Sequence, residues 1–160
     1  MRSLQTHGGA LVDTSHAVIT VRGLFLMQLR DFNRDITCPG HWGFFGGHRE
    51  VGENSYDTIY RELEEELGIK FSDLECLGDL WLEKTRRTCV FTGELLFETN
   101  SISLGEGQEF GVFPTDQILS ASLPSKKFGK SFPVTPGAMA TFQFYLSVPV
   151  SCHSPSFKLP

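Results

Sequence analysis

The sequence lacks the cysteine pattern of a zinc-stabilised or disulfide-stabilised protein. Its 160 residues contain four widely scattered cysteines, and no two of them form a Cys-x-x-Cys pair. Structural zinc sites and small secreted scaffolds normally need closely spaced cysteines. We therefore expect free, reduced thiols with mostly structural roles at Cys38, Cys76, Cys89 and Cys152.

Long hydrophobic runs and an excess of positive charge are also missing. No apolar run is long enough to span a bilayer, and the first residues lack the pattern of a secretory signal. The formal net charge of -5 disfavours non-specific binding to a polyanion such as DNA. The sequence therefore predicts a cytoplasmic protein with no membrane segment and no stable nucleic-acid complex, and it leaves a homodimer open.

No internal repeat, linker or low-complexity tract divides the chain. Its length suits one domain, and 14 phenylalanines among 40% hydrophobic residues supply bulky side chains for one core. Residues 1–15 contain Gly8-Gly9 and little periodicity, so we expect a flexible lead-in there. The predicted organisation is that lead-in, a single domain over residues 16–148 and a tail over residues 149–160.

Turn residues and alternating apolar residues predict several strands. Two strands are expected in His16–Arg30, separated by a turn at Arg22-Gly23, and a loop follows over Asp31–His41. Further expected elements are a short strand at Trp42–Phe45, strands at Leu74–Glu83, Thr88–Phe97 and Gln108–Phe113, a short helix at Pro114–Ser120, an irregular stretch at Ser122–Pro136, and a final helix at Ala138–Val148, where a strand is the alternative.

The segment Asn54–Leu67 has the clearest helical pattern in the chain. Asn54 is a suitable N-cap, Asp57 completes an arrangement like a capping box, and Gly68 is suited to end the helix. Apolar residues recur at spacings of three and four, which predicts one buried stripe made of Tyr56, Ile59, Leu63 and Leu67.

Three carboxylates lie on another face of this predicted helix. Glu62, Glu65 and Glu66 occupy positions i, i+3 and i+4, so their side chains converge. Each like-charge pair at this spacing costs roughly 0.2–0.5 kcal/mol on an exposed helix. A solvated acidic face is one interpretation. The other is a site for Mg²⁺ or Mn²⁺, because carboxylate oxygens are the ligands that these ions prefer.

The residues upstream favour the metal site. Gly47 is followed after five residues by Glu53, and after seven more by Arg61-Glu62-Leu63, Glu65-Glu66 and Gly68-Ile69. Average amino-acid usage makes a chance match of this pattern on the order of 10⁻⁷. The segment resembles the Nudix box at every specified position. The resemblance implies an α/β fold, the Nudix α/β/α sandwich with a mixed β-sheet, and a hydrolase that cleaves the pyrophosphate bond of a nucleoside diphosphate linked to another group.

The resemblance also implies roles for individual residues. Glu65 and Glu66 would bind the essential divalent metal, Glu62 would be a further ligand or the base that activates water, and the Gly46 carbonyl would complete the site. A late loop carries Glu106, which resembles the fourth carboxylate of MutT-type members, with Glu109 as the alternative.

Arg61 stands next to Glu62 and could pair with Glu53, which would fix the loop to the helix by a charge-assisted hydrogen bond. We count both among the catalytic residues. A purely structural salt bridge is the alternative interpretation.

Residues outside the box bear on the substrate. Phe45 replaces the usual Pro before Gly46-Gly47, as in a bacterial subgroup with the pattern WGxFGG. Lys84 stands where ADP-ribose hydrolases have a Pro, and Thr85, Arg86 and Arg87 stand where dinucleoside-polyphosphate hydrolases have a Tyr. The SQPWPxPxS signature of NADH hydrolases is missing. These departures leave a sugar nucleotide or a (deoxy)nucleoside triphosphate as the leading substrates.

Several side chains are candidates for substrate contact. Basic residues could hold phosphates, and tryptophans could stack on a base, although surface charge and core packing are the alternatives. The candidates are Arg30, Lys84, Arg86, Arg87, Trp42 and Trp81. The five histidines show no metal-ligand spacing and are interpreted as incidental.

Two rival functions share the predicted fold. Isomerase chemistry on isopentenyl diphosphate needs a different glutamate arrangement and a larger protein. A catalytically silent domain that senses nucleotides commonly loses box carboxylates, whereas this chain keeps them all.

Overall fold

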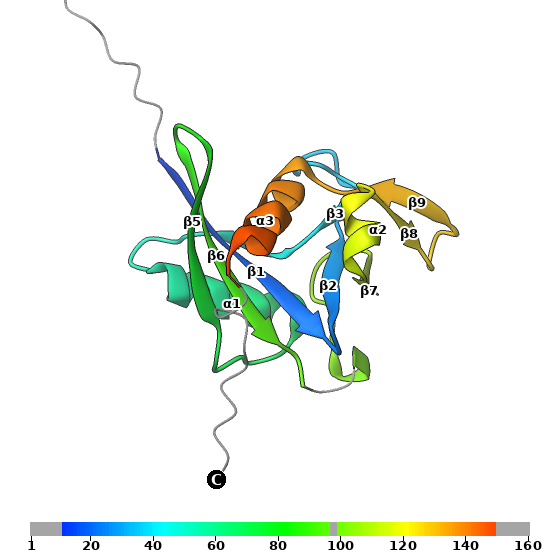
Figure 1. The fold of residues 1–160 in the computed structure, drawn as a ribbon, viewed down its shortest axis with the longest axis horizontal. Coiled ribbons are helices and arrows are strands. Elements are labelled where there is room, and N and C mark those ends of the chain that lie inside the picture. The colour runs from blue at the N-terminus through cyan, green and yellow to red at the C-terminus, as the bar shows by residue number, and fades with distance from the viewer. Residues whose placement is uncertain (1–10, 97–98, 150–160) are drawn as a thin grey trace, which may run out of the picture.

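The computed structural model describes residues 11–96 and 99–149 of the chain (Figure 1). Within these residues seven strands form one mixed sheet, in which β3, β2, β1, β6 and β5 are neighbours in that order, while β4 pairs with β1 and β7 with β2. Only β1 and β6 run parallel among these pairs. The strands are β1 Val12–Val21, β2 Leu24–Leu29, β3 Trp42–Gly43, β4 Phe45–His48, β5 Glu75–Glu83, β6 Arg86–Glu94 and β7 Glu109–Phe113.

Helices cover both faces of this sheet. The helix α1 (Ser55–Leu67) lies behind the sheet in Figure 1, and α3 (Pro136–Ser147) lies in front of it. The remaining elements are α2 Thr115–Leu119, the short 3₁₀ helix η1 Thr99–Ser101, and a separate two-stranded sheet of β8 Ser122–Ser125 and β9 Lys130–Pro133. The arrangement is a mixed sheet between helices, which confirms the predicted α/β/α sandwich. No helix in the described residues is long and apolar enough to cross a membrane.

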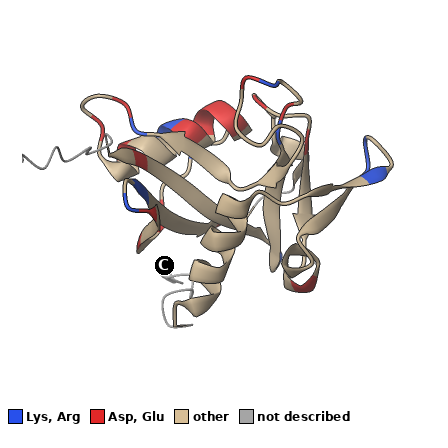
Figure 2. Cartoon of the chain, turned by 90° about the horizontal axis from the view of Figure 1, so that it is seen from above, with Lys and Arg blue, Asp and Glu red and all other residues tan. Residues whose placement is uncertain are grey.

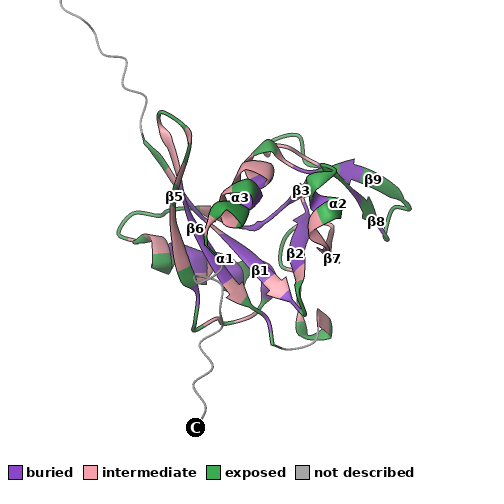
Figure 3. Ribbon diagram, in the orientation of Figure 1, coloured by how far each residue is buried: buried purple, intermediate pink, exposed green. Residues whose placement is uncertain are grey.

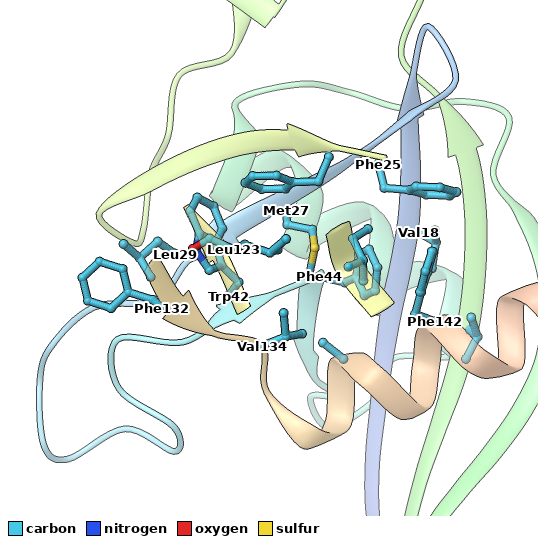
Figure 4. Packing of buried hydrophobic residues seen from close by; sticks show 14 residues of the cluster. Val18, Phe25, Met27, Leu29, Trp42, Phe44, Leu123, Phe132, Val134 and Phe142 are labelled. Carbon is cyan, nitrogen blue, oxygen red and sulfur yellow. The ribbon is translucent and has the colours of Figure 1, made fainter. Parts of the chain in front are cut away.

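Two hydrophobic clusters hold these layers together, one on each side of the sheet (Figure 3). Under α1, three helix residues pack against β1 and β6 with no exposed surface: Ile59, Leu63 and Leu67. On the other face, α3 and the β8–β9 hairpin pack against the sheet through Phe142, Leu123 and Phe132 (Figure 4). Because apolar burial contributes about 25 cal/mol per Å², these two clusters fix how each helix lies on the sheet.

The first strand begins earlier than the sequence predicts. β1 starts at Val12, so the predicted lead-in over residues 1–15 is wrong for its last four residues, and residues 1–10 lie outside the described part. The first half of the strand was not predicted because Asp13–His16 are all polar and show no alternation of apolar and polar residues. It is stabilised instead by parallel pairing with β6 and by a 2.8 Å hydrogen bond between the hydroxyls of Thr14 and Thr88.

The predicted irregular stretch Ser122–Pro136 is also wrong, because most of it forms the β8–β9 hairpin. Proline cannot donate to a strand ladder, so its frequency here argues against strands. A two-stranded sheet consists of edge strands, which tolerate Pro124 and Pro133. The segment ends in α3, whose N-cap is Thr135 and whose first residue is Pro136. The helix prediction for Ala138–Val148 is therefore confirmed over its strand alternative.

Trp42 is a core residue. Its side chain has no exposed surface, its ring packs edge-on against Phe113 at 4.9 Å, and its Nε1 donates to the Leu123 carbonyl oxygen at 3.1 Å. The prediction that Trp42 stacks on a substrate base is wrong, since the ring is used to join β3 to the β8–β9 hairpin (Figure 4). Trp81 is 54% exposed on β5.

The two tryptophans make a matched pair for testing this packing. We expect Trp42→Phe to lower the free energy of unfolding by about 2–4 kcal/mol, because it leaves a void and removes the hydrogen bond to the Leu123 carbonyl. Trp81→Phe should change it by less than about 0.5 kcal/mol, since the side chain is exposed. Urea denaturation of both variants measures this. Equal losses would contradict the assignment of Trp42 to the core.

Candidate active site

The helix α1 is positioned by its two ends and its buried face. The Asn54 side chain accepts from the backbone N–H of Tyr56 and Asp57, and Asp57 accepts in turn from the backbone N–H of Asn54. Gly68 ends the helix with a left-handed φ of 66°. These features confirm the predicted capping. Tyr56 departs from the predicted stripe, because it is 45% exposed and packs its ring edge-on against Phe91.

With α1 fixed in this way, Glu62, Glu65 and Glu66 line a cavity that also includes β4 residues. Figure 2 shows acidic residues gathered along one helix of the fold. Gly46 and Gly47 allow this close approach. A Cβ on Gly47 would lie 2.3 Å from Oε1 of Glu62. A Cβ on Gly46, whose φ is 137°, would lie 2.1 Å from the carbonyl oxygen of Ser15. Gly46 therefore requires glycine, because its neighbours are backbone atoms and its φ is positive. At Gly47 a side chain would force the Glu62 carboxylate out of its position.

The cavity has a volume of about 550 Å³ and is lined by both acidic and basic residues. The acidic residues are Glu50, Glu62, Glu65, Glu66 and Glu106. The basic residues include Arg30, just after β2, and Arg86 at the start of β6. Residues at the start of α3 also line the cavity, among them Thr135, Ala138 and Thr141.

Glu66 is the most buried of these carboxylates, with 4% of its surface exposed. Its Oε2 accepts from the Gly46 backbone N–H at 2.8 Å, and its Oε1 accepts from Nε2 of Gln28 at 2.7 Å. Burial raises the pKa of Glu66 to about 7, although these two hydrogen bonds oppose the shift, and the charges of Glu62 and Glu106 add to it. A positive charge nearby would favour the ionised form of this carboxyl group and lower its pKa.

Glu62 shares this environment. Burial raises its pKa above the usual range, and the charges of Glu65 and Glu106 act in the same direction. Arg61 opposes the shift through a hydrogen bond at 2.9 Å to Oε1 of Glu62. A carboxylate whose pKa is raised is a better proton acceptor when it is ionised, which suits a general base.

Arg61 connects the loop before α1 to the helix. Its Nε donates to Oε1 of Glu53 at 2.6 Å and its Nη2 to Oε2 at 3.0 Å, so the predicted pairing is confirmed. Arg61 also donates to the His48 carbonyl and to Glu65 at 3.3 Å. Hydrogen bonds from Arg61, and then from the Glu50 backbone, lower the pKa of Glu53 to about 2. Glu53 therefore acts on the site through Arg61 and stays ionised.

The donor set fits a hard divalent cation. Glu62, Glu65, Glu66 and Glu106 line one cavity, and the charges of neighbouring glutamates contribute to the raised pKa of both Glu62 and Glu66. Among the described residues, no three acidic, His or Cys side chains are already close enough together to hold an ion. Glu62 and Glu65 are each hydrogen-bonded to Arg61 instead. Oxygen donors of this kind suit Mg²⁺ or Mn²⁺.

The two candidates for the fourth carboxylate have different positions. Glu106 lines the cavity, and Gly105 beside it lies so close to the Glu65 carbonyl that a Cβ would be 2.0 Å away. Glu109 instead accepts hydrogen bonds from the Ser125 hydroxyl and from the backbone N–H of Lys126. Glu109 therefore holds the β8–β9 turn and is not among the residues that line the cavity.

The basic residues predicted to bind substrate also differ in their position relative to the cavity. Arg30 and Arg86 line the cavity, whereas Lys84 and Arg87 are not among its lining residues. Arg87 pairs with Asp13 through two hydrogen bonds of 2.8 and 3.1 Å. Its role is to join β6 to β1, so the suggestion that Arg87 holds a phosphate is not supported by its position.

One cavity residue was missed in the sequence. His16 lies on β1, opposite Gly46 in the strand register, and its side chain lines the cavity. Burial, and then the charges of Arg86 and Arg30, lower the pKa of His16 to about 4, so the imidazole is neutral at pH 7. This position does not support the interpretation of all five histidines as incidental. The sequence has one weak signal for it, a polar residue directly before the apolar half of β1.

The family follows from the whole domain. The family model named NUDIX domain matches residues 11–132. The chain belongs to the Nudix family. This confirms the predicted Nudix hydrolase. A comparison with curated proteins found no match.

Solved structures with the Nudix fold resemble this chain at low sequence identity. A MutT protein from Methanosarcina mazei Go1 is 23% identical, with a TM-score of 0.63 over 90% of this chain and 97% of that one. A MutT/Nudix family protein from Listeria innocua is 18% identical, with a TM-score of 0.67 over 88% and 94%. The Nudix domain of Shewanella oneidensis NrtR, solved with ADP-ribose, is 15% identical, with a TM-score of 0.62 over 91% and 94%.

The buried Glu66 predicts a pH dependence of stability without divalent ions. Its folded pKa of about 7 lies above the value near 4.3 of an unfolded chain, so the folded state holds this proton more tightly. Ionisation then lowers the free energy of unfolding as the pH rises from about 5 to 8, by on the order of 3 kcal/mol at most.

Urea unfolding in EDTA at pH 5 and pH 8 measures this effect. Glu66→Gln should lose less stability over that range than the wild type. Glu64→Gln is the matched control, because Glu64 is exposed on the same helix and paired with Lys70. Parallel pH profiles for wild type and Glu66→Gln would contradict the assigned shift.

Proposed function

We propose that this protein is a Mg²⁺-dependent hydrolase that cleaves the pyrophosphate bond of a nucleoside diphosphate derivative. A sugar nucleotide and a (deoxy)nucleoside triphosphate are the leading substrates. The observation that carries the proposal is that Glu62, Glu65, Glu66 and Glu106 line one cavity together with Arg30 and Arg86. The carboxylates suit a divalent cation and the arginines suit phosphate oxygens, so the cavity suits a diphosphate held by a cation.

The carboxylates would hold the metal, together with the Gly46 carbonyl oxygen. When bound, Mg²⁺ would neutralise phosphate charge and lower the pKa of a water molecule. Glu62 would accept the proton of the water that attacks phosphorus, since its pKa is raised and its side chain is more accessible than that of Glu66. Arg61, itself held by Glu53, would keep Glu62 in position through the 2.9 Å hydrogen bond.

The basic residues of the cavity, Arg30 and Arg86, would bind phosphate groups of the substrate. The guanidinium groups of Arg30 and Arg86 suit phosphate oxygens, because they present several donors in one plane. Arg30 already has its Nε bonded to the Thr37 carbonyl at 3.0 Å, which limits its movement. Neutral His16 between them offers one donor and one acceptor nitrogen. The ADP-ribose bound by the NrtR domain supports a nucleoside diphosphate derivative as a ligand of this fold.

A nucleotide screen with Mg²⁺, scored by phosphate or nucleoside monophosphate release, tests the proposal. For the best substrate, Glu62→Gln should lower kcat/KM by about 10²–10⁴-fold, because it removes the proton acceptor. Glu64→Gln should stay within about twofold, because Glu64 is exposed and is not among the residues that line the cavity.

The same screen separates a hydrolase from a domain that only senses nucleotides. Turnover that is lost with EDTA and in Glu65→Gln would support the hydrolase. Tight binding without release across the panel, with Glu65→Gln indistinguishable from the wild type, would overturn it.

Arg86 and its neighbour Arg87 test whether the basic residues of the cavity bind the substrate. We expect Arg86→Gln to raise KM by about 10- to 100-fold, since a hydrogen bond to a charged group contributes about 1.5–3 kcal/mol. Arg87→Gln should leave KM unchanged, because Arg87 is paired with Asp13 outside the cavity. Steady-state kinetics on the substrate found in the screen measure both. A larger effect from Arg87→Gln would contradict the assignment.

A further inference from the structure

Two cysteines that are not among the residues lining the cavity lie in contact under α1. The Sγ atoms of Cys76 on β5 and Cys89 on β6 are 3.4 Å apart. The two strands are antiparallel neighbours, but Cys76 is paired with Phe91 and Cys89 with Asp79. A register shift between Cys76 and Gly78, where Gly78 has a φ of 130°, bends β5 and brings the two thiols together diagonally.

This contact is close to what a disulfide requires. A disulfide needs an S–S distance of about 2.05 Å and strands near enough for the Cβ atoms to approach. Sulfur atoms 3.4 Å apart on neighbouring strands reach that distance through small side-chain rotations. Cys76 is partly exposed, so a small reagent can reach it, whereas Cys89 is buried.

We propose that Cys76 and Cys89 form a reversible redox site that is oxidised by small-molecule disulfides such as oxidised glutathione. The Cys76 thiolate attacks one sulfur of the reagent, which forms a mixed disulfide and releases one thiolate. Cys89 then loses its proton and attacks Sγ of Cys76, which forms the protein disulfide and releases the second thiolate. The protein loses two electrons and two protons, and the reagent is reduced to two thiols.

The environments of the two thiols assign these roles. Burial, and then the hydrogen bond with Cys76, raise the pKa of the Cys89 thiol to about 12. A thiol with so little thiolate reacts poorly with an external reagent. Cys89 is therefore the resolving cysteine, which reacts only once Cys76 carries the leaving group next to it.

The site touches the start of the helix that carries the glutamates. A hydrogen bond from the Ser55 side chain acts on Cys89, and Ser55 is the first residue of α1. The Ser55 carbonyl oxygen accepts from Oγ of Ser15, which lies opposite Cys89 in the β1–β6 register. Oxidation moves Sγ of Cys89 toward Cys76 and away from this contact, so the first turn of α1 responds to the redox state.

Mass spectrometry of the full chain tests the proposal. After treatment with oxidised glutathione, the wild type should lose about two mass units, as expected for a disulfide, and a non-reducing digest should contain one cross-linked pair of peptides carrying Cys76 and Cys89. Dithiothreitol should reverse both changes. Cys89→Ser should instead keep a glutathione adduct on Cys76, and Cys76→Ser should form no cross-link.

Control variants keep the outcome clear. Cys38→Ser and Cys152→Ser should cross-link like the wild type. Cys89→Ala replaces Cys89→Ser if the serine variant has a lower Tm in the reduced state. Cross-links that involve Cys38 or Cys152, or a wild type that stops at the glutathione adduct, would overturn the proposal.

Hydrogen exchange tests the link to α1. Amide exchange at Tyr56, Asp57 and Thr58 should differ between the reduced and the oxidised protein, while exchange at Met139 in α3 stays the same. Identical exchange at the start of α1 would overturn the link to the helix.

Discussion

The buried carboxylate of Glu66 ties together the elements that form the active site. It accepts one hydrogen bond from the backbone of β4 at Gly46 and another from Gln28 of β2, while its own backbone belongs to α1. Burying a charge is expensive unless it is hydrogen-bonded and paired. The two hydrogen bonds meet part of that requirement, and the raised pKa shows the part that remains. This one group therefore joins α1 to β4 and β2 beside the cavity.

The residues that line the cavity come from several elements. Acidic residues come mainly from α1 and the Glu106 loop, which pack on each other so closely that Gly105 has no room for a side chain. Basic residues come from the end of β2 and the start of β6. The Glu106 loop is also joined to β2, because the Gln108 N–H donates to the Leu29 carbonyl oxygen. Arg61 pairs with Glu53 and Glu62 and so holds the loop before α1 to the helix.

Local signals explain how much of this could be predicted from the sequence. The cap residues, the apolar spacing and Gly68 act within α1, so the helix and its carboxylates were predictable. The β8–β9 hairpin was not, because its turn is held by Glu109 from another strand. The burial of Trp42 and the cavity position of His16 depend in the same way on distant partners. The contact of Cys76 with Cys89 depends on the register shift between Cys76 and Gly78, which the residue pattern does not predict.

The start of α3 adds residues to the cavity that the family match does not include. The match to the family ends at residue 132, before α3 begins at Pro136, yet the first turns of this helix line the cavity. Substitutions in these turns would change the shape of the cavity without changing any of the carboxylates. Part of the surface that would face a ligand is therefore built by a stretch of the chain with no acidic residue of its own.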